Sequence, residues 1–451
     1  MSFMMAFGWA GIMLCMGMFL RVKIPAFRKM LVPTGVIAGI LGIIFMNVAM
    51  GADVDVGTDM EMFTSIVNHL FTVSFISISL TSTPQEEKGN AGNVLKGAVS
   101  MGLLWCLLYS MTPVIATGAL YLMSSITDMS PGYGMLIQFA FCQGPGQSAA
   151  YGAIFEQYGW DYASTVAITF ASIGFIVAFL IGIPAAKLGV KRGIAKHCGK
   201  IDEAILKGYF RKEEQTEYMV KDTTCSSNIE TLAFHFALIG VCYVLAVGIG
   251  KILSYIPGFL GTSMSSMMFM NGMYAAYLVK WLMKKLHLDF LQENVLQSKI
   301  TGWTADYLVV CAFMAVSVDM ISRWLLPIFV VVLVTTVVTF AVSFYFGQRI
   351  GGVNDFERTL GLYGTCTGTV PSGIALVRII DPEFKTTTSV ELGAMNLVML
   401  ASTPVYIFIL AYASDSLSLS STILALLGCA VVYLILLKAT KSWGKKSYHW
   451  K

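Results

Sequence analysis

The sequence carries little charge for its length. Only 12% of its 451 residues are Asp, Glu, Lys or Arg, whereas a soluble domain carries about 25%. The charges lie between long apolar runs, and each run approaches the roughly 20 residues that a helix needs to cross a bilayer. The runs lack the alternation of apolar and polar residues that marks membrane β-strands. The composition therefore predicts an all-α integral membrane protein, and the net charge of +4 bears on its orientation rather than on nucleic-acid binding.

The sequence also lacks the patterns of metal sites and intramembrane enzymes. None of its nine cysteines forms a CxxC pair, and its five histidines form no His-x-x-x-His motif. No pair of aspartates is placed at membrane depth. We expect the cysteines to be small buried hydrophobic residues without a disulfide framework. The sequence therefore predicts neither an enzyme nor a bound cofactor.

The apolar runs predict eleven membrane spans, bounded by charged and turn-forming residues. We expect them at residues 3–20, 30–50, 62–80, 97–122, 161–183, 230–250, 263–281, 303–322, 324–346, 388–412 and 418–437. Basic residues follow the first run and do not precede it, so this run predicts a span rather than a cleavable signal. This arrangement places the N-terminus outside.

The charges of later loops agree with this orientation, since short basic loops stay in the cytoplasm. The loop 51–61 has acidic residues and no Lys or Arg, and it falls outside. The loop 187–228 is rich in Lys and Arg and falls inside, as do Arg349, Arg358 and the basic C-terminal end. Within this loop, Ile201 to Val220 predicts either an amphipathic surface helix or a flexible linker.

The loops fall on the sides that their charges indicate only if two apolar segments, 132–158 and 359–381, enter the membrane and return to the same side. We expect two re-entrant hairpins, one entering from outside and the other from the cytoplasm. Each half then holds five transmembrane helices plus one hairpin, and the second half is inverted relative to the first. The predicted domains are a first repeat (1–186), a cytoplasmic central loop (187–228), an inverted second repeat (229–413), and an extra transmembrane helix with a basic tail (414–451).

Both hairpins carry helix-breaking residues near their centres. Broken helices at membrane depth expose N–H groups that suit an anionic substrate and C=O groups that suit Na⁺. The alternative is that the glycines serve only close helix packing. The candidate binding residues are Gln143, Gly144, Gly146, Gln147, Ser148, Thr365, Thr367, Gly368, Thr369 and Ser372.

Charged and polar residues after each hairpin are further candidates. Arg378 follows the second tip and could pair with a substrate carboxylate. It could equally reach the membrane surface or pair with Asp381. Four residues form a second tier in the spans that follow the hairpins, namely Thr169, Ser172, Glu391 and Asn396. For His69 we expect an interhelical hydrogen bond.

Several stretches resemble the glutamate:sodium symporter family of bacteria. Residues 33–39 (PTGVIAG) are similar to an early stretch of the family. Residues 143–151 (QGPGQSAAY) with 155–159 (FEQYG) resemble its Gly-Gly-x-Gly-Thr-Gly-Ala-Ala-Trp hairpin and the Glu-Arg-Tyr-Gly that follows. The second hairpin, with Gly368, Pro371 and 374–375 (IA), looks like the family's second glycine-rich tip.

The resemblance implies inverted five-span repeats and Na⁺-coupled uptake of glutamate across the bacterial inner membrane. It also implies a homodimer that moves substrate by an elevator-like shift of the hairpin domain. The sequence departs from the family pattern at Gln143, Pro145, Gln147 and Arg378, and in its extra C-terminal span. Fold and sodium coupling therefore transfer more directly than the substrate does.

These observations predict a Na⁺-coupled symporter that imports a small carboxylate, with glutamate as the leading substrate. Its expected partners are the substrate, Na⁺, the lipid bilayer and a second copy of the chain, and no nucleic acid. Two alternatives are a proton-coupled organic-anion carrier that uses Glu391, and a substrate-gated membrane sensor. A channel is disfavoured because the sequence shows no ring-forming filter motif.

Overall fold

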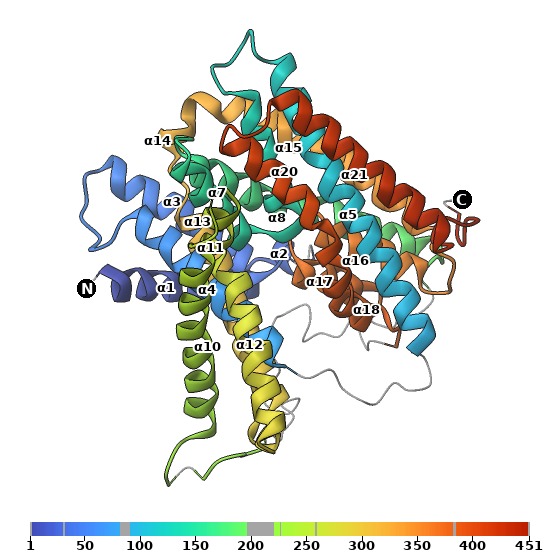
Figure 1. Cartoon of the computed structure of the whole chain (residues 1–451). Coiled ribbons are helices and arrows are strands. Elements are labelled where there is room, and N and C mark those ends of the chain that lie inside the picture. Colours follow the sequence, from blue (N-terminus) through green and yellow to red (C-terminus); the bar gives the residue numbers. More distant parts are fainter. Residues whose placement is uncertain are drawn as a thin grey trace. The chain divides into compact units, whose positions relative to one another are not determined.

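The computed structural model describes residues 2–29, 32–81, 91–195, 221–225, 227–257, 259–381 and 385–449. These residues form helices and connecting loops, with no β-strand in the described ranges (Figure 1). The predicted amphipathic segment from Ile201 to Val220 lies outside them. The chain divides into two compact units. The first comprises Met1–Met16, Ala38–Glu86 and Phe210–Ala315, and the second comprises Gly17–Ile37, Glu87–Tyr209 and Val316–Lys451.

Among the described residues, eight helices are long and apolar enough to cross a membrane. They confirm the expectation of a multi-pass helical membrane protein, and each lies at a predicted span. They are α1 (Ser2–Lys23), α3 (Thr34–Gly51), α4 (Met60–Leu80), α5 (Ala91–Leu122), α8 (Ala163–Lys191), α10 (Thr231–Leu253), α15 (Leu325–Gly347) and α21 (Leu419–Ala439).

The other three predicted spans differ in extent from the structure. The seventh corresponds to α12 (Met268–Lys285). The eighth was expected at 303–322, whereas α13 (Asn294–Met314) begins earlier and ends earlier. The bounds predicted for the eighth span were wrong because residues 294–302 include several polar residues, which looked like a loop. The structure nevertheless buries Gln297 completely in this helix, so tertiary packing overrides the polar pattern.

The tenth predicted span, 388–412, is interrupted rather than continuous. It consists of four short elements, α18 (Thr388–Ala394), α19 (Asn396–Met399), η5 (Leu400–Ser402) and α20 (Thr403–Ala413). Pro404 lies in the first turn of α20, where its missing N–H costs nothing, so the proline favours a new helix start at that point.

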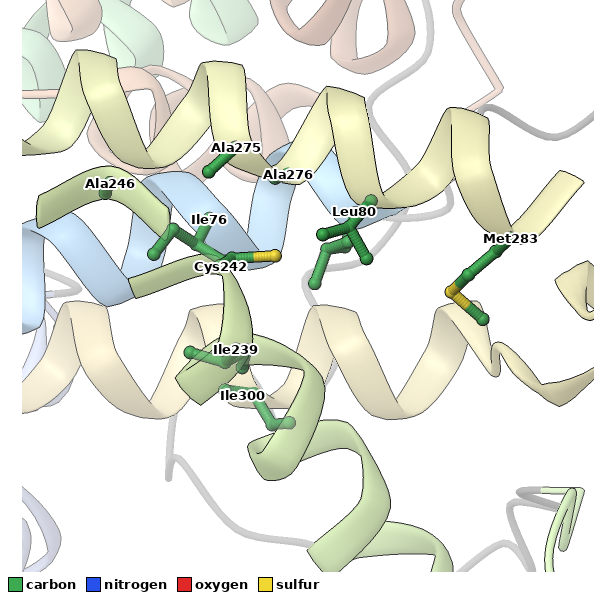
Figure 2. Packing of buried hydrophobic residues seen from close by; sticks show 10 residues of the cluster. Ile76, Leu80, Ile239, Cys242, Ala246, Ala275, Ala276, Met283 and Ile300 are labelled. Carbon is green, nitrogen blue, oxygen red and sulfur yellow. The ribbon is translucent and has the colours of Figure 1, made fainter. Parts of the chain in front are cut away.

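The first unit is built on α4, α10, α12 and α13, with α11 (Phe259–Ser266) and η3 (Asp289–Leu291) joining them. Asp59 caps the start of α4 by accepting a 2.7 Å hydrogen bond from the Met62 N–H. Apolar side chains from α4, α10, α12 and α13 form a buried cluster, which Figure 2 shows with Ile76, Cys242 and Ile300 among its members. Small residues of α12 in this cluster let the helices approach closely.

Two histidines connect helices within the first unit. His69 Nδ1 of α4 lies 2.6 Å from the Tyr243 hydroxyl of α10, which confirms the predicted interhelical hydrogen bond. His235 of α10 is fully buried. Its Nε2 accepts from the Glu293 N–H at 2.8 Å, and its Nδ1 lies 2.8 Å from the Thr231 carbonyl. Both nitrogens of His235 therefore have partners within the protein.

The second unit contains two broken helix pairs. Helices α6 (Ile137–Gln143) and α7 (Pro145–Gln157) form the first pair, preceded by η1 (Pro131–Leu136). Helices α16 (Asp355–Thr365) and α17 (Val370–Ile380) form the second. Helices α5, α8 and α15 pack against these pairs, and α21, drawn red, lies along α5, drawn cyan (Figure 1). Short helices α2 (Pro25–Lys29), α14 (Val318–Ile321) and η4 (Ser322–Trp324) complete the unit.

Candidate functional site

The first break is a single residue, Gly144, between α6 and α7. Its φ is +77°, a conformation that favours glycine because it carries no Cβ. The Gly144 N–H still bonds to the Ala140 carbonyl at 3.0 Å, and Pro145 then starts α7. Because α7 starts there, the N–H groups of Gly146 and Gln147 have no carbonyl partner within that helix.

The second break is longer. Helix α16 ends at Thr365, and three turn residues lead to Thr369, whose backbone is extended at φ −149°. Helix α17 starts at Val370 with Pro371 in its first turn. Thr369 is the residue just before α17, and an extended backbone is the usual conformation of a residue that precedes the first helical residue.

The two breaks lie against each other. A Cβ on Gly144 would collide with the Thr369 methyl group and would lie 3.1 Å from the Gly368 carbonyl oxygen. The thiols of Cys142 and Cys366, one from each break, lie close enough to interact. A Cβ on Gly174 of α8 would lie 2.7 Å from the Thr367 carbonyl oxygen, so α8 closes in on the same place. Two helix starts and two helix ends therefore converge within one compact unit.

Amide side chains line the first break. Gln147 is only 3% exposed, and the Tyr109 hydroxyl of α5 donates to its Oε1 over a long 3.4 Å. The Gln143 Oε1 has no hydrogen-bond partner among the described residues. Ser148 donates to the Gly144 carbonyl at 3.0 Å. The break thus presents neutral amide groups, some of which have bonding capacity left.

Hydroxyl groups line the second break, and their protons are largely used within α16. Thr365 donates to the Gly361 carbonyl at 2.8 Å, and Thr367 donates to the Tyr363 carbonyl at 2.7 Å. The Thr369 and Ser372 hydroxyls are 3.4 Å apart. A hydroxyl that donates to its own helix still has oxygen lone pairs, so this set suits a cation better than an anion.

Arg378 lies in the last turn of α17, beyond the residues of the break, and its side chain is exposed. Asp381, the alternative partner for Arg378, accepts from the N–H groups of Lys385 and Thr386 at 2.9 and 2.8 Å. It also accepts from the Thr386 hydroxyl at 2.7 Å.

The second-tier residues divide into two groups. Thr169 and Ser172 are buried on α8, which packs against both pairs. Thr169 donates to the Thr165 carbonyl at 2.6 Å, whereas the Ser172 hydroxyl has no partner in the described part of the chain. Asn396 is exposed and donates to the Gly393 carbonyl at 3.0 Å, so it is directed to its own backbone.

Glu391 belongs to a buried ion pair that sequence reasoning missed. Both its oxygens accept from Arg358, at 2.7 Å from Nε and 2.7 Å from Nη2. Arg358 also pairs with Asp355 at 3.2 Å and is only 4% exposed. Arg358 was expected in a loop beside Arg349, and its assignment to a loop was wrong because α16 begins at Asp355 and buries it. The Asp355-x-x-Arg358 spacing, which joins both side chains on one helix face, was the available signal.

Gln138, like Arg358, is a residue that the sequence did not single out as a candidate. It lies on α6, is fully buried, and neither of its amide atoms has a hydrogen-bond partner among the described residues. An amide buried without partners costs free energy. No local motif distinguishes it, because its neighbours in α6 are apolar.

Broken helices that meet in a chain rich in helices long enough to cross a membrane are typical of membrane transport proteins. The family model for sodium/glutamate symporters matches residues 1–386, so the chain belongs to that family. The chain is thus a Na⁺-coupled transporter rather than an enzyme, and the resemblance found in the sequence is confirmed. A comparison with curated proteins gives no match. Residues 387–451, which include Glu391 and α21, follow the matched region.

Proposed function

We propose that the protein imports glutamate together with Na⁺ and binds both where the two breaks meet. The observation that carries this proposal is the close approach of Gly144 to Gly368 and Thr369. It brings helix starts, with their partial positive charge, next to helix ends, with their partial negative charge. An anionic substrate and a cation can then bind side by side.

The roles follow from the groups at each break. The N–H groups at the starts of α7 and α17 suit the substrate carboxylates. The carbonyl groups at the ends of α6 and α16, with the hydroxyls of Thr365 and Thr367, suit Na⁺. Gln143 and Gln147 can donate to or accept from the polar groups of the amino acid.

Uptake into vesicles tests the proposal. The purified protein is reconstituted, and accumulation of labelled glutamate is measured with an inward Na⁺ gradient and with the gradient abolished. We expect accumulation only with the gradient. Aspartate and dicarboxylates serve as competitors, and their inhibition of glutamate uptake shows which substrate the protein prefers. Accumulation driven equally by a proton gradient in the absence of Na⁺ would contradict the proposed coupling.

We further infer that the halves are inverted repeats with the re-entrant hairpins 132–158 and 359–381. The order of elements supports this: α5, a broken pair and α8 in one half, then α15, a broken pair and α18 to α20 in the other. An inward C-terminus and an outward N-terminus follow from the loop charges. Single cysteines placed in the loops 51–61 and 348–354 test this inference, because impermeant thiol reagents should label them from opposite sides.

An elevator-like movement of a homodimer is the proposed mechanism. Its support is that both broken pairs belong to one compact unit, so the whole site can move as one body. We also propose that the protein lies in the bacterial inner membrane. Cross-linking and mass measurement of the detergent-solubilised protein test the dimer, and a monomeric mass under active conditions would argue against it.

A further inference from the structure

The segment after α21 folds back onto the second unit. We call residues 440–449 the strap. The buried Ser442 Oγ lies 2.7 Å from the Ser100 Oγ of α5. The Gly444 N–H donates to the Arg349 carbonyl at 2.8 Å, just after the end of α15. The strap therefore fastens the end of α21 to α5 and to the loop that follows α15.

The end of the strap contacts the start of α16. Ser447 donates through its N–H to the Gln348 carbonyl at 2.8 Å, and its Oγ lies 2.6 Å from Asp355 Oδ2. The Tyr448 hydroxyl lies 2.9 Å from the Thr359 hydroxyl. The ring of Tyr448 packs edge-on against Phe356, with centroids 5.4 Å apart. Two consecutive strap side chains thus reach the first turns of one helix.

Tyr448 stays protonated at physiological pH. Burial raises its pKa, its hydrogen bond to Thr359 lowers the pKa by less than burial raises it, and the charges of Asp355 and Glu357 raise it somewhat further. A neutral hydroxyl can both donate and accept, so the bond to Thr359 persists across the pH range in which a transporter works.

The strap is connected to the buried ion pair. Asp355 accepts from Ser447 through Oδ2 and pairs with Arg358 through Oδ1, and Arg358 pairs with Glu391. Glu391 in turn accepts from the Thr387 hydroxyl at 2.7 Å. The chain of bonds runs from the strap, through the base of α16, to α18. Both of its ends, Ser447 and Glu391, follow the region that the family model matches.

Helix α16 carries the effect of the strap to the site. All its residues are buried, it starts at Asp355, and it ends at Thr365 beside the second break. A helix of this length spans about 16 Å, so a rotation of about 4° at its base moves its far end by about 1 Å. Misplacement on that scale weakens binding and catalysis in preorganised sites.

We propose that Ser447 and Tyr448 are positioning residues that hold α16, and with it the second break, in the geometry that binds substrate. This inference rests on the proposed function of the breaks. The strap acts on affinity through the helix it holds, without touching the substrate.

The test compares two double variants of the full chain in reconstituted vesicles. Ser447→Ala with Tyr448→Phe removes both hydroxyls and keeps the ring against Phe356. Lys445→Ala with Lys446→Ala changes exposed neighbours in the same strap and is the matched control. For the first variant we expect KM for glutamate to rise about three- to tenfold with Vmax within about twofold, a split that reports lost binding geometry. The control should match the unmodified protein.

Measurement of Tm tests the contact between Tyr448 and Thr359 independently of transport. Thr359→Val and Tyr448→Phe are tested singly and together, and their effects on Tm should be non-additive because the two hydroxyls are bonded to each other. Unchanged KM for the hydroxyl variant, or additive effects on Tm, would overturn the inference. If the unmodified protein shows no Na⁺-driven uptake, the proposed function fails, while the thermal cycle still decides whether the strap holds α16.

Discussion

At the scale of single residues, Gly144 carries the strongest constraint. Its backbone, at φ +77° and ψ −167°, lies in a region that is essentially confined to glycine, and it would cost a residue with a Cβ about 1–3 kcal/mol. The Cβ would also meet Thr369 across the break. Gly144 therefore ties the geometry of one break to that of the other.

We expect Gly144→Ala to reduce Na⁺-driven glutamate uptake at least about tenfold, because about 1.4 kcal/mol corresponds to a factor of ten. The measurement is initial uptake rate per reconstituted protein. Gly118→Ala is the control, since a Cβ there meets nothing within 4 Å. Equal rates for the two variants would show that the close approach is not needed for transport.

The Arg358–Glu391 pair makes a different prediction. Removing one partner leaves a buried charge unpaired, which typically costs about 3–5 kcal/mol. We expect Glu391→Gln to lower Tm strongly, with Na⁺ dependence retained in whatever protein folds. Lys438→Gln, an exposed change on α21, should leave Tm unchanged. Loss of ion coupling at normal Tm would instead support the alternative of a proton carrier that uses Glu391.

At the scale of elements, the sequence predicted most helices because apolar runs and helix-breaking residues could both be recognised in it. Gly144 and Pro145 marked the first break, and Pro371 marked the second. The sequence missed the start of α13, because Gln297 and its polar neighbours looked like a loop. It also missed the burial of Arg358, because a charge read alone does not reveal partners that lie far along the chain. Glu391 is 33 residues away from Arg358.

The contact between the two breaks can be tested with native thiols. Cys142 and Cys366 are buried and adjacent, so a short bifunctional thiol cross-linker that reaches them should join α6 to the end of α16. We expect cross-linking to block uptake, because the bridge would occupy the place between the breaks where the substrate and Na⁺ are proposed to bind. Cys366→Ser should resist the reagent and keep its uptake. Equal inhibition of both proteins would place the reactive thiols elsewhere.

At the scale of the whole molecule, coupling means that each ligand stabilises the form that binds the other. A ligand at about 100 times its Kd stabilises the folded state by about 2.7 kcal/mol. We expect glutamate to raise Tm only when Na⁺ is present, and replacement of Na⁺ by choline to abolish the shift. Stabilisation by glutamate without Na⁺ would separate substrate binding from the ion.

The composition of the two compact units bears on how the protein is made. Helix α4 packs on α12 and α13, and α5 packs on α15 and α21, so helices made early have partners that are made late. Until the second half is synthesised, the packing faces of the first half are therefore covered only by lipid or by the insertion machinery. Two separately synthesised halves, divided within the central loop, should acquire protease resistance only when they are produced in the same cell.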